Sequence, residues 1–212
     1  MRPVLITGFE PFGSDQRNPS QEIAGQLDGR VIGRRRVIGR VLPCVFGASV
    51  TTLKRMVRQE RPELVICVGV AGGRRDITPE RVAINLDDAR IPDNAGRQPL
   101  DRPVVGNGPT AYFTTLPIKA IVAGLRERKV PASVSPTAGT FVCNHVFYGL
   151  MHLLRDQRSV RGGFIHVPLL PDQAHRGEPS LALEVMVEAI TFAIEMSLRT
   201  KRDFRTAGGE IG

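Results

Sequence analysis

The sequence predicts an α/β protein of one domain whose central sheet is largely parallel. Short apolar runs typical of buried strands alternate along the chain with longer segments whose apolar residues recur at helical spacing. Alternation of this kind favours parallel strands joined by helical crossovers. Since 212 residues fit one ordinary domain, we place that domain at 1–198, followed by a polar tail at 199–212 that is expected to fray.

The first half of the chain begins with a predicted strand at 4–7 and a glycine-containing loop at 8–13. Asn18 and Pro19 then mark a helix start, because asparagine is a favoured cap and proline is favoured at the first helical position. Apolar spacing further predicts a strand at 37–42, a helix at 46–59, and a buried strand at 64–68 that ends in a glycine-rich loop at 69–73.

The second half contains a predicted short strand at 81–85 and then a polar, proline-punctuated segment at 87–109. Structureless loops longer than about 12 residues are uncommon in compact domains and often act as lids or binding loops. The remaining predicted elements are a helix at 116–128, a strand at 132–136, a helix at 143–154, a strand at 163–167 and a closing helix at 179–198.

Composition and charge disfavour several classes of protein. The formal net charge is +8, but the basic pairs are scattered over separate elements, with no tryptophan and only 2 tyrosines beside them. Solvated basic faces explain this charge better than a nucleic-acid site does. Three cysteines, an odd number, favour free thiols in a reducing compartment. Because no apolar run reaches the roughly 18 residues of a membrane span, we expect a cytoplasmic protein with no membrane or nucleic-acid partner.

A cysteine and a histidine are the candidate catalytic residues. Cys143 opens a predicted helix, and His166 lies near the end of a predicted strand. Unpaired N–H groups and the dipole at a helix start, together with a nearby imidazole, are expected to lower the pKa of the thiol. A thiolate formed in this way can attack a carbonyl group. Loops that follow parallel strands meet at one sheet edge, so those at 8–13, 69–73 and 140–144 are expected to converge on this pair.

Other interpretations of these residues stay open at this point. Buried cysteines and hydrogen-bonded histidines at strand ends are common, and Glu80 by itself is more typical of a surface carboxylate. The glycine-rich loop with two arginines at 69–75 is compatible with a phosphate-using transferase, although it lacks the ending of a P-loop. Glycine there is equally explained if the backbone passes close to Cys143. A basic binding module is the non-enzymatic alternative. His145 and His152 lie seven residues apart without a carboxylate cluster, which does not favour a metal site.

Four long motifs follow one another along the chain: TGFEPFG at 7–13, PERVAIN at 79–85 continuing through DARIPDN at 88–94, AGTFVCNH at 138–145, and GFIHVP at 163–168. In these motifs the sequence resembles the pyroglutamyl peptidase type I family, also called pyrrolidone carboxyl peptidases, which are cysteine peptidases. The resemblance covers nearly the whole chain. It implies a three-layer α/β/α sandwich, usually a homotetramer, removal of N-terminal pyroglutamate from peptides, and no metal or organic cofactor.

The resemblance also implies roles for individual residues. It assigns a catalytic triad to Glu80, Cys143 and His166. His166 would take the proton of the thiol, and Glu80 would select the tautomer of the imidazole. The backbone N–H of Cys143 and the side chain of Arg90 are the candidate donors to the oxyanion.

The substrate pocket follows from the chemistry of pyroglutamate, a small neutral lactam that needs apolar walls and a few backbone donors and acceptors. The resemblance places the ring against Phe9 and Phe12 and near the backbone of Phe141 and Val142. Val70 stands where many relatives carry glutamine. Without that amide, we expect reduced affinity or selectivity and intact catalytic machinery.

Overall fold

The computed structural model of the protein describes residues 1–205 and 207. In this part of the chain, six strands form the central sheet. Their order across the sheet is β2-β3-β1-β4-β8-β5. The neighbours β3, β1, β4 and β8 are parallel, and only β2 and β5, at the two edges, run antiparallel to their neighbours. The predicted, largely parallel sheet is therefore confirmed. The strands are β1 Val4–Phe9, β2 Val31–Ile32, β3 Arg35–Leu42, β4 Leu64–Val70, β5 Thr78–Pro79 and β8 Arg161–Val167.

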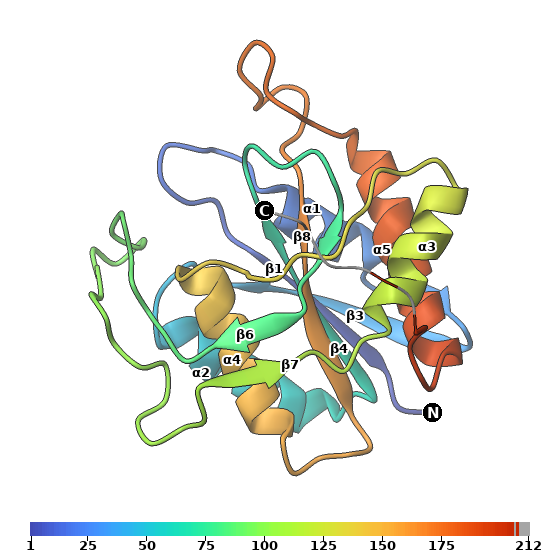
Figure 1. Ribbon diagram of the computed structural model, residues 1–212, viewed down its shortest axis with the longest axis horizontal. Helices are drawn as coiled ribbons and strands as arrows, with labels where there is room; N and C mark the ends of the chain where they lie inside the picture. Colours follow the sequence, from blue (N-terminus) through green and yellow to red (C-terminus); the bar gives the residue numbers. More distant parts are fainter. Residues whose placement is uncertain (206, 208–212) are drawn as a thin grey trace.

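Within the described part of the chain, five helices cover the two faces of this sheet and complete three layers (Figure 1). Successive side chains of β1 point to opposite faces, as the pleat of a strand requires. Val4 and Ile6 pack with α1, α3 and α5, whereas Leu5 packs with α2 and α4. Burial on both faces explains why the strands read as continuous apolar runs. The helices are α1 Pro19–Leu27, α2 Ala48–Glu60, α3 Ile118–Glu127, α4 Val142–Leu154 and α5 Leu183–Arg199.

The loop between β1 and α1 is held by the predicted cap. Asn18 Oδ1 accepts a hydrogen bond from the backbone N–H of Ser20, and Pro19 is the first helical residue. The Ser20 hydroxyl in turn accepts from the N–H of Phe9. A β-carbon at Gly8 would lie 2.0 Å from the carbonyl oxygen of Ser20, so only glycine lets α1 pack this closely against β1. These contacts fix the loop at the carboxyl end of β1.

A second, two-stranded sheet lies against α4. It pairs β6 Val82–Ile84 with β7 Ala111–Phe113 in antiparallel register. The Asn144 side chain, from α4, donates to the carbonyls of Ile84 and Leu86 and accepts from the N–H of Ile84. The predicted long excursion at 87–109 therefore starts from a strand that is tied to the first turn of α4.

The structure corrects two predicted elements. Residues 132–136 do not form a strand, because Pro131 and Pro136 lack backbone donors and only isolated bridges pair the segment with 77–80. The closing helix begins at Leu183 rather than at 179, since Ser180 forms a bridge with Leu169. Strands β2, β5 and β7 have only two or three residues each, too few for a periodic signal.

The beginning of the predicted tail is attached to the domain. The Asp203 carboxylate accepts hydrogen bonds from the backbone N–H groups of Lys119 and Ala120, at the start of α3. Arg161, on β8, donates to the carbonyl of Thr200. The rest of the predicted tail includes residues 206 and 208–212, which lie outside the described residues. Within the described residues, no helix has the length and apolar character needed to span a membrane.

Candidate active site

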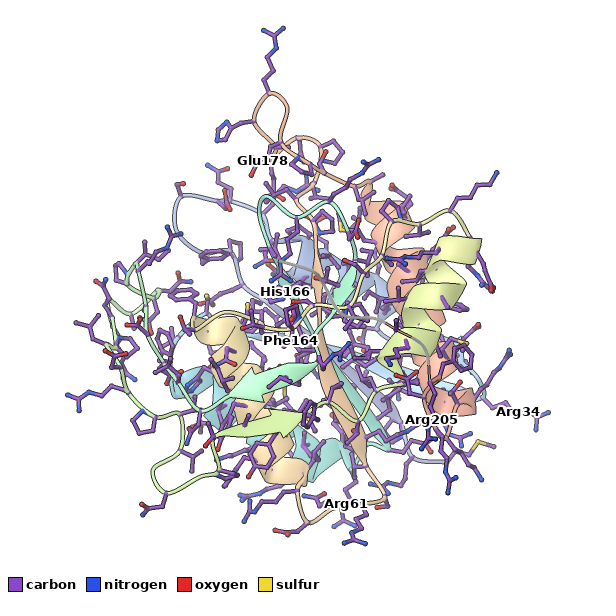
Figure 2. The ribbon with its side chains drawn as sticks, in the orientation of Figure 1. Arg34, Arg61, Phe164, His166, Glu178 and Arg205 are labelled. Carbon is purple, nitrogen blue, oxygen red and sulfur yellow. The ribbon has the colours of Figure 1, made fainter. Side chains whose placement is uncertain are left out.

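A cavity of about 220 Å³ lies at the carboxyl ends of the parallel strands. The loops after β1 and β4, the residues before α4 and the end of β8 contribute to its lining, as predicted for loops that follow parallel strands. Figure 2 shows His166 and Phe164, both on β8, near the centre of the molecule. The lining includes Phe9, Phe12, Val70, Arg74, Phe141, Cys143 and His166.

Cys143 is the second residue of α4, which begins one residue earlier than predicted, at Val142. Cys143 is half-buried, whereas Cys44 and Cys67 are buried. A β-carbon at Gly69 would lie 2.9 Å from Cys143 Sγ, so the end of β4 passes directly beside the sulfur. This confirms the interpretation in which glycine lets the backbone approach the thiol.

His166 and Glu80 form a buried hydrogen-bonded pair. His166 Nδ1 lies 2.7 Å from Glu80 Oε1, and the two residues are 4% and 0% exposed. An ionised carboxylate can only accept hydrogen bonds, so the contact with Glu80 places the imidazole hydrogen on Nδ1. His166 Nε2 is then left as an acceptor. The backbone brings the pair together, because the N–H of Glu80 donates to the carbonyl of Phe164 directly after β5 pairs with β8. Glu80 is therefore not the surface carboxylate that its sequence context alone favours.

Arg74 also contacts Glu80, a contact that the sequence did not reveal. Its Nη1 atom lies 2.7 Å from Glu80 Oε1, the same oxygen that His166 contacts. Only the position of Arg74 in the glycine-rich loop after β4 could have indicated a place near the site. The ion pair between Arg74 and Glu80 forms because the chain turns back between β4, which precedes Arg74, and β5, which precedes Glu80.

Burial raises the pKa of the Cys143 thiol, and the nearby Cys44 and Glu80 raise it further, while Arg74 acts in the opposite direction. The predicted lowering of this pKa is therefore wrong for the free protein. Desolvation of the sulfur is the largest cause of this rise. Such a thiol becomes a nucleophile when a neighbouring base takes its proton.

Aromatic rings form the apolar part of the cavity. Phe12 and Phe141 lie 6.1 Å apart between ring centroids, and both contribute to the lining together with Phe9 and Val70. Val142, the first residue of α4, has its side chain fully buried in the core, so it can offer the cavity only its backbone.

Three predicted site residues, Glu80, Arg90 and Val142, are not among the lining residues. Arg90 differs from the other two because it is exposed, whereas they are buried. Its segment is nevertheless attached to the edge of the cavity. The Thr140 hydroxyl donates to the carbonyl of Asp88 at 2.6 Å, and the N–H of Asp88 donates to the carbonyl of Thr140 at 3.1 Å. Arg90 follows two residues later along the chain.

The two histidines of α4 have separate structural partners. His145 Nδ1 lies 2.8 Å from Asp87 Oδ2, and its Nε2 accepts from the N–H of Gly47 at the start of α2. His152 Nδ1 lies 2.8 Å from the Tyr112 hydroxyl. Among the residues that the structure describes, no group of three or more His, Cys, Asp or Glu side chains could hold a metal ion.

Comparison with known proteins decides which family carries this site. A family model described as pyroglutamyl peptidase matches residues 2–200. The chain belongs to the pyroglutamyl peptidase family. It is 59% identical to a pyrrolidone-carboxylate peptidase of Chromobacterium violaceum, with 100% of both chains covered. It is 58% identical to one of Klebsiella pneumoniae, with 99% of both covered.

Solved structures of this family have the same fold. Pyroglutamyl peptidase I of Bacillus amyloliquefaciens is 45% identical and superposes with a TM-score of 0.95, over 97% of this chain and 99% of that one. Pyrrolidone carboxyl peptidase of Thermococcus litoralis is 42% identical and gives a TM-score of 0.91, with 100% of both chains covered. The family resemblance and the three-layer α/β fold are thus confirmed. The comparisons give no support to the phosphate-using transferase or to the non-catalytic binding module.

Proposed function

We propose that this member of the pyroglutamyl peptidase family is a cysteine exopeptidase that removes an N-terminal pyroglutamyl residue from peptides and proteins through a thioester acyl-enzyme. One observation supports the proposal beyond the family: Cys143 and His166 line the same aromatic cavity, and His166 is hydrogen-bonded to the buried Glu80. A nucleophile, a base and a group that orients the base are the parts that such catalysis requires.

The reaction begins when His166 Nε2 accepts the proton of the Cys143 thiol as sulfur attacks the carbonyl carbon of the pyroglutamyl residue. The C–N bond of the tetrahedral intermediate then breaks, and the leaving amine takes that proton from the imidazolium. A water molecule, deprotonated by His166, attacks the resulting thioester. The products are free pyroglutamate and the shortened peptide, and Cys143 regains its proton. Glu80 holds the Nδ1–H tautomer throughout and stabilises the imidazolium.

Two donors are proposed for the oxyanion. The backbone N–H of Cys143 lies in the first turn of α4, where N–H groups have no partner within the helix. Arg90 would supply a second, charged donor by turning from solvent toward the substrate carbonyl. The attachment of Asp88 to Thr140 supports this role, because it holds the Arg90 segment beside the cavity. Donors placed before the reaction stabilise the developing charge at little reorganisation cost.

The pyroglutamyl ring would be bound by the aromatic side of the cavity. We assign its walls to Phe9, Phe12, Val70 and Phe141, and polar contacts with the lactam to the backbone at Phe141 and Val142. The distances between the rings and the place of Val70 in the lining support this assignment. A residue that is not cyclised would leave buried polar groups unmatched, which is a strong basis for selectivity.

The proposal extends to organisation and location. We infer that residues 1–198 form one peptidase domain, that it acts in the cytoplasm on peptides rather than on nucleic acid or membranes, and that it works as a homotetramer. Phe113, on β7, is 71% exposed and supports an association surface near the start of α3. Light scattering after size-exclusion chromatography would give the mass of the assembly, and a purely monomeric protein would contradict this part of the proposal.

The first test is hydrolysis of a pyroglutamyl amide that carries a fluorescent leaving group. The wild type should release the fluorophore, the Cys143→Ala variant should not, and the prolyl analogue should be a poor substrate because it lacks the ring carbonyl. Addition of a chelator should leave the rate unchanged. Wild-type turnover by a folded Cys143→Ala variant, or equal rates on both amides, would contradict the proposed function.

A further inference from the structure

Arg74 connects three segments that surround the candidate active site. Its Nη1 atom lies 2.7 Å from Glu80 Oε1, 2.9 Å from Thr78 Oγ1 and 3.3 Å from Ser135 Oγ. Its Nη2 atom donates to the carbonyl of Thr137 at 3.1 Å. Thr137 directly precedes the segment that lines the cavity and leads into α4. One guanidinium thus joins the loop after β4, the strand β5 and the approach to Cys143.

The ionised form of the Glu80 carboxylate depends strongly on its contact with Arg74. Glu80 is completely buried, and its Oε1 atom receives both Arg74 and His166 at 2.7 Å. Its Oε2 atom is buried and has no hydrogen-bond partner among the described residues. A buried carboxylate without a compensating cation is costly, and it is commonly neutralised by taking up a proton. Arg74 is the cation in direct contact with it.

A protonated Glu80 would disable the base. It could donate its proton to His166 Nδ1, and the imidazole hydrogen would then reside on Nε2. An Nε2–H group cannot accept the proton of Cys143, so the thiol would lack a base even though every catalytic side chain was present. The ion pair therefore decides whether His166 Nε2 carries a hydrogen or is free to accept one.

We propose that Arg74 is a positioning residue of this enzyme: it keeps Glu80 ionised and oriented, so that His166 presents a free Nε2 to Cys143. This inference deepens the proposed peptidase function and rests on it. The geometry also explains why position 74 suits arginine better than lysine. The planar guanidinium can contact a carboxylate and a separate carbonyl at once, whereas the ammonium of lysine acts as a point charge.

Other charged groups lie near Glu80 and have to be considered in any pH dependence. Cys143 contributes from α4 and His166 from β8. Arg75 and Asp76 line an outer cavity together with Arg74, on the side of Thr78 and Ser135. Arg75 is exposed, which makes it a matched control: it is the next residue, of the same type, and its removal changes the net charge equally.

The test compares Arg74→Gln, Arg74→Lys and Arg75→Gln as full-length proteins, with folding checked by circular dichroism. For Arg74→Gln we expect kcat on the pyroglutamyl amide to fall about 100-fold or more near neutral pH, with a KM within about threefold of wild type. The acid limb of its kcat/KM profile should move to higher pH, because loss of the Arg74 charge favours the protonated form of the buried Glu80–His166 pair, in which Nε2 carries a hydrogen. Arg74→Lys should keep the acid limb and lose only part of kcat, and Arg75→Gln should match wild type.

A second readout needs no peptide substrate. The rate at which iodoacetamide alkylates Cys143, followed by mass spectrometry against pH, should show the same shift to higher pH in Arg74→Gln and none in Arg75→Gln. If wild type cleaves no pyroglutamyl amide but this shift occurs, the proposed function fails and the role of Arg74 in thiol activation stands. In a folded Arg74→Gln variant, a lower kcat with the acid limb and the alkylation profile unmoved would overturn the inference, as would wild-type kinetics of that variant. Should Arg74→Gln not fold, Arg74→Lys decides: a reduced kcat at an unmoved acid limb supports the role, and an unchanged kcat overturns it.

Discussion

Gly69 lies directly against the thiol of Cys143: a β-carbon at position 69 would come within 2.9 Å of Sγ and within 2.8 Å of the Phe164 ring. Both distances are shorter than non-bonded carbon contacts allow, so a side chain here must displace the sulfur or the ring. The last residues of β4 therefore define where the nucleophile can stand.

The Gly69→Ala substitution should for this reason reduce activity on a pyroglutamyl amide by about tenfold or more, and should destabilise the fold by about 1–3 kcal/mol, as overpacking does. Gly72→Ala is the matched control, because the nearest atom to its new β-carbon would lie 3.6 Å away. Kinetics and urea unfolding of both variants check this. Equal activity in the two variants would show that the thiol tolerates displacement.

Val70 offers a test of substrate affinity, since it lines the cavity where the family resemblance implies glutamine in many relatives. Val70→Gln should add one hydrogen bond to the lactam, worth about 0.5–1.5 kcal/mol, and so lower the KM for a pyroglutamyl amide about two- to tenfold at a similar kcat. Val70→Met has a similar length without the amide and should not lower KM. A higher KM in Val70→Gln than in Val70→Met would argue against lactam contact at this position.

Alkaline pH should destabilise the protein through Cys67, whose pKa burial raises to about 12. The folded protein keeps this proton while the unfolded chain releases it near the ordinary thiol value, so the unfolded state binds fewer protons above that value. The free energy of unfolding should then fall by about 1.4 kcal/mol per pH unit for this group, from about pH 9 up to its folded pKa.

Comparison of wild type with Cys67→Val measures that contribution, because valine fills a similar buried volume and cannot ionise. Urea unfolding under reducing conditions at several pH values from neutral to about pH 10.5 should show a shallower decline in the variant. The other titrating groups are common to both proteins and cancel in the difference. Parallel declines would mean that Cys67 ionises in the folded state as it does in the unfolded chain.

Asp203 tests whether the segment after α5 belongs to the stable domain. Its carboxylate accepts from the N–H groups of Lys119 and Ala120, and so it caps α3 from a distant part of the chain. Asp203→Ala should lower the free energy of unfolding by about 1 kcal/mol, the usual effect of losing a helix cap. Asp156→Ala removes an exposed carboxylate and should change it by less than about 0.5 kcal/mol. Equal stability of the two variants would place the domain boundary before Asp203.

The sequence by itself determined the layered α/β fold, because a strand buried on both faces must be apolar throughout and a helix that covers it must be apolar on one side. Local chemistry also determined the start of α1, where Asn18 and Pro19 act within a few residues of each other. Position indicated a candidate nucleophile and base, because Cys143 and His166 lie at the ends of regular elements that share one edge of the sheet. The resemblance of the surrounding motifs to a known family then assigned their roles.

Tertiary structure alone decided the interactions that join distant segments. The contacts of Arg74 and His166 with one oxygen of Glu80 arise where the loop after β4, β5 and β8 meet, and no local pattern records that meeting. The direction of the Cys143 pKa shift was decided in the same way, since a helix start is visible in sequence but desolvation depends on what encloses the sulfur. Local pattern therefore selected the reactive groups, and the packing of residues distant in sequence set their protonation states and surroundings.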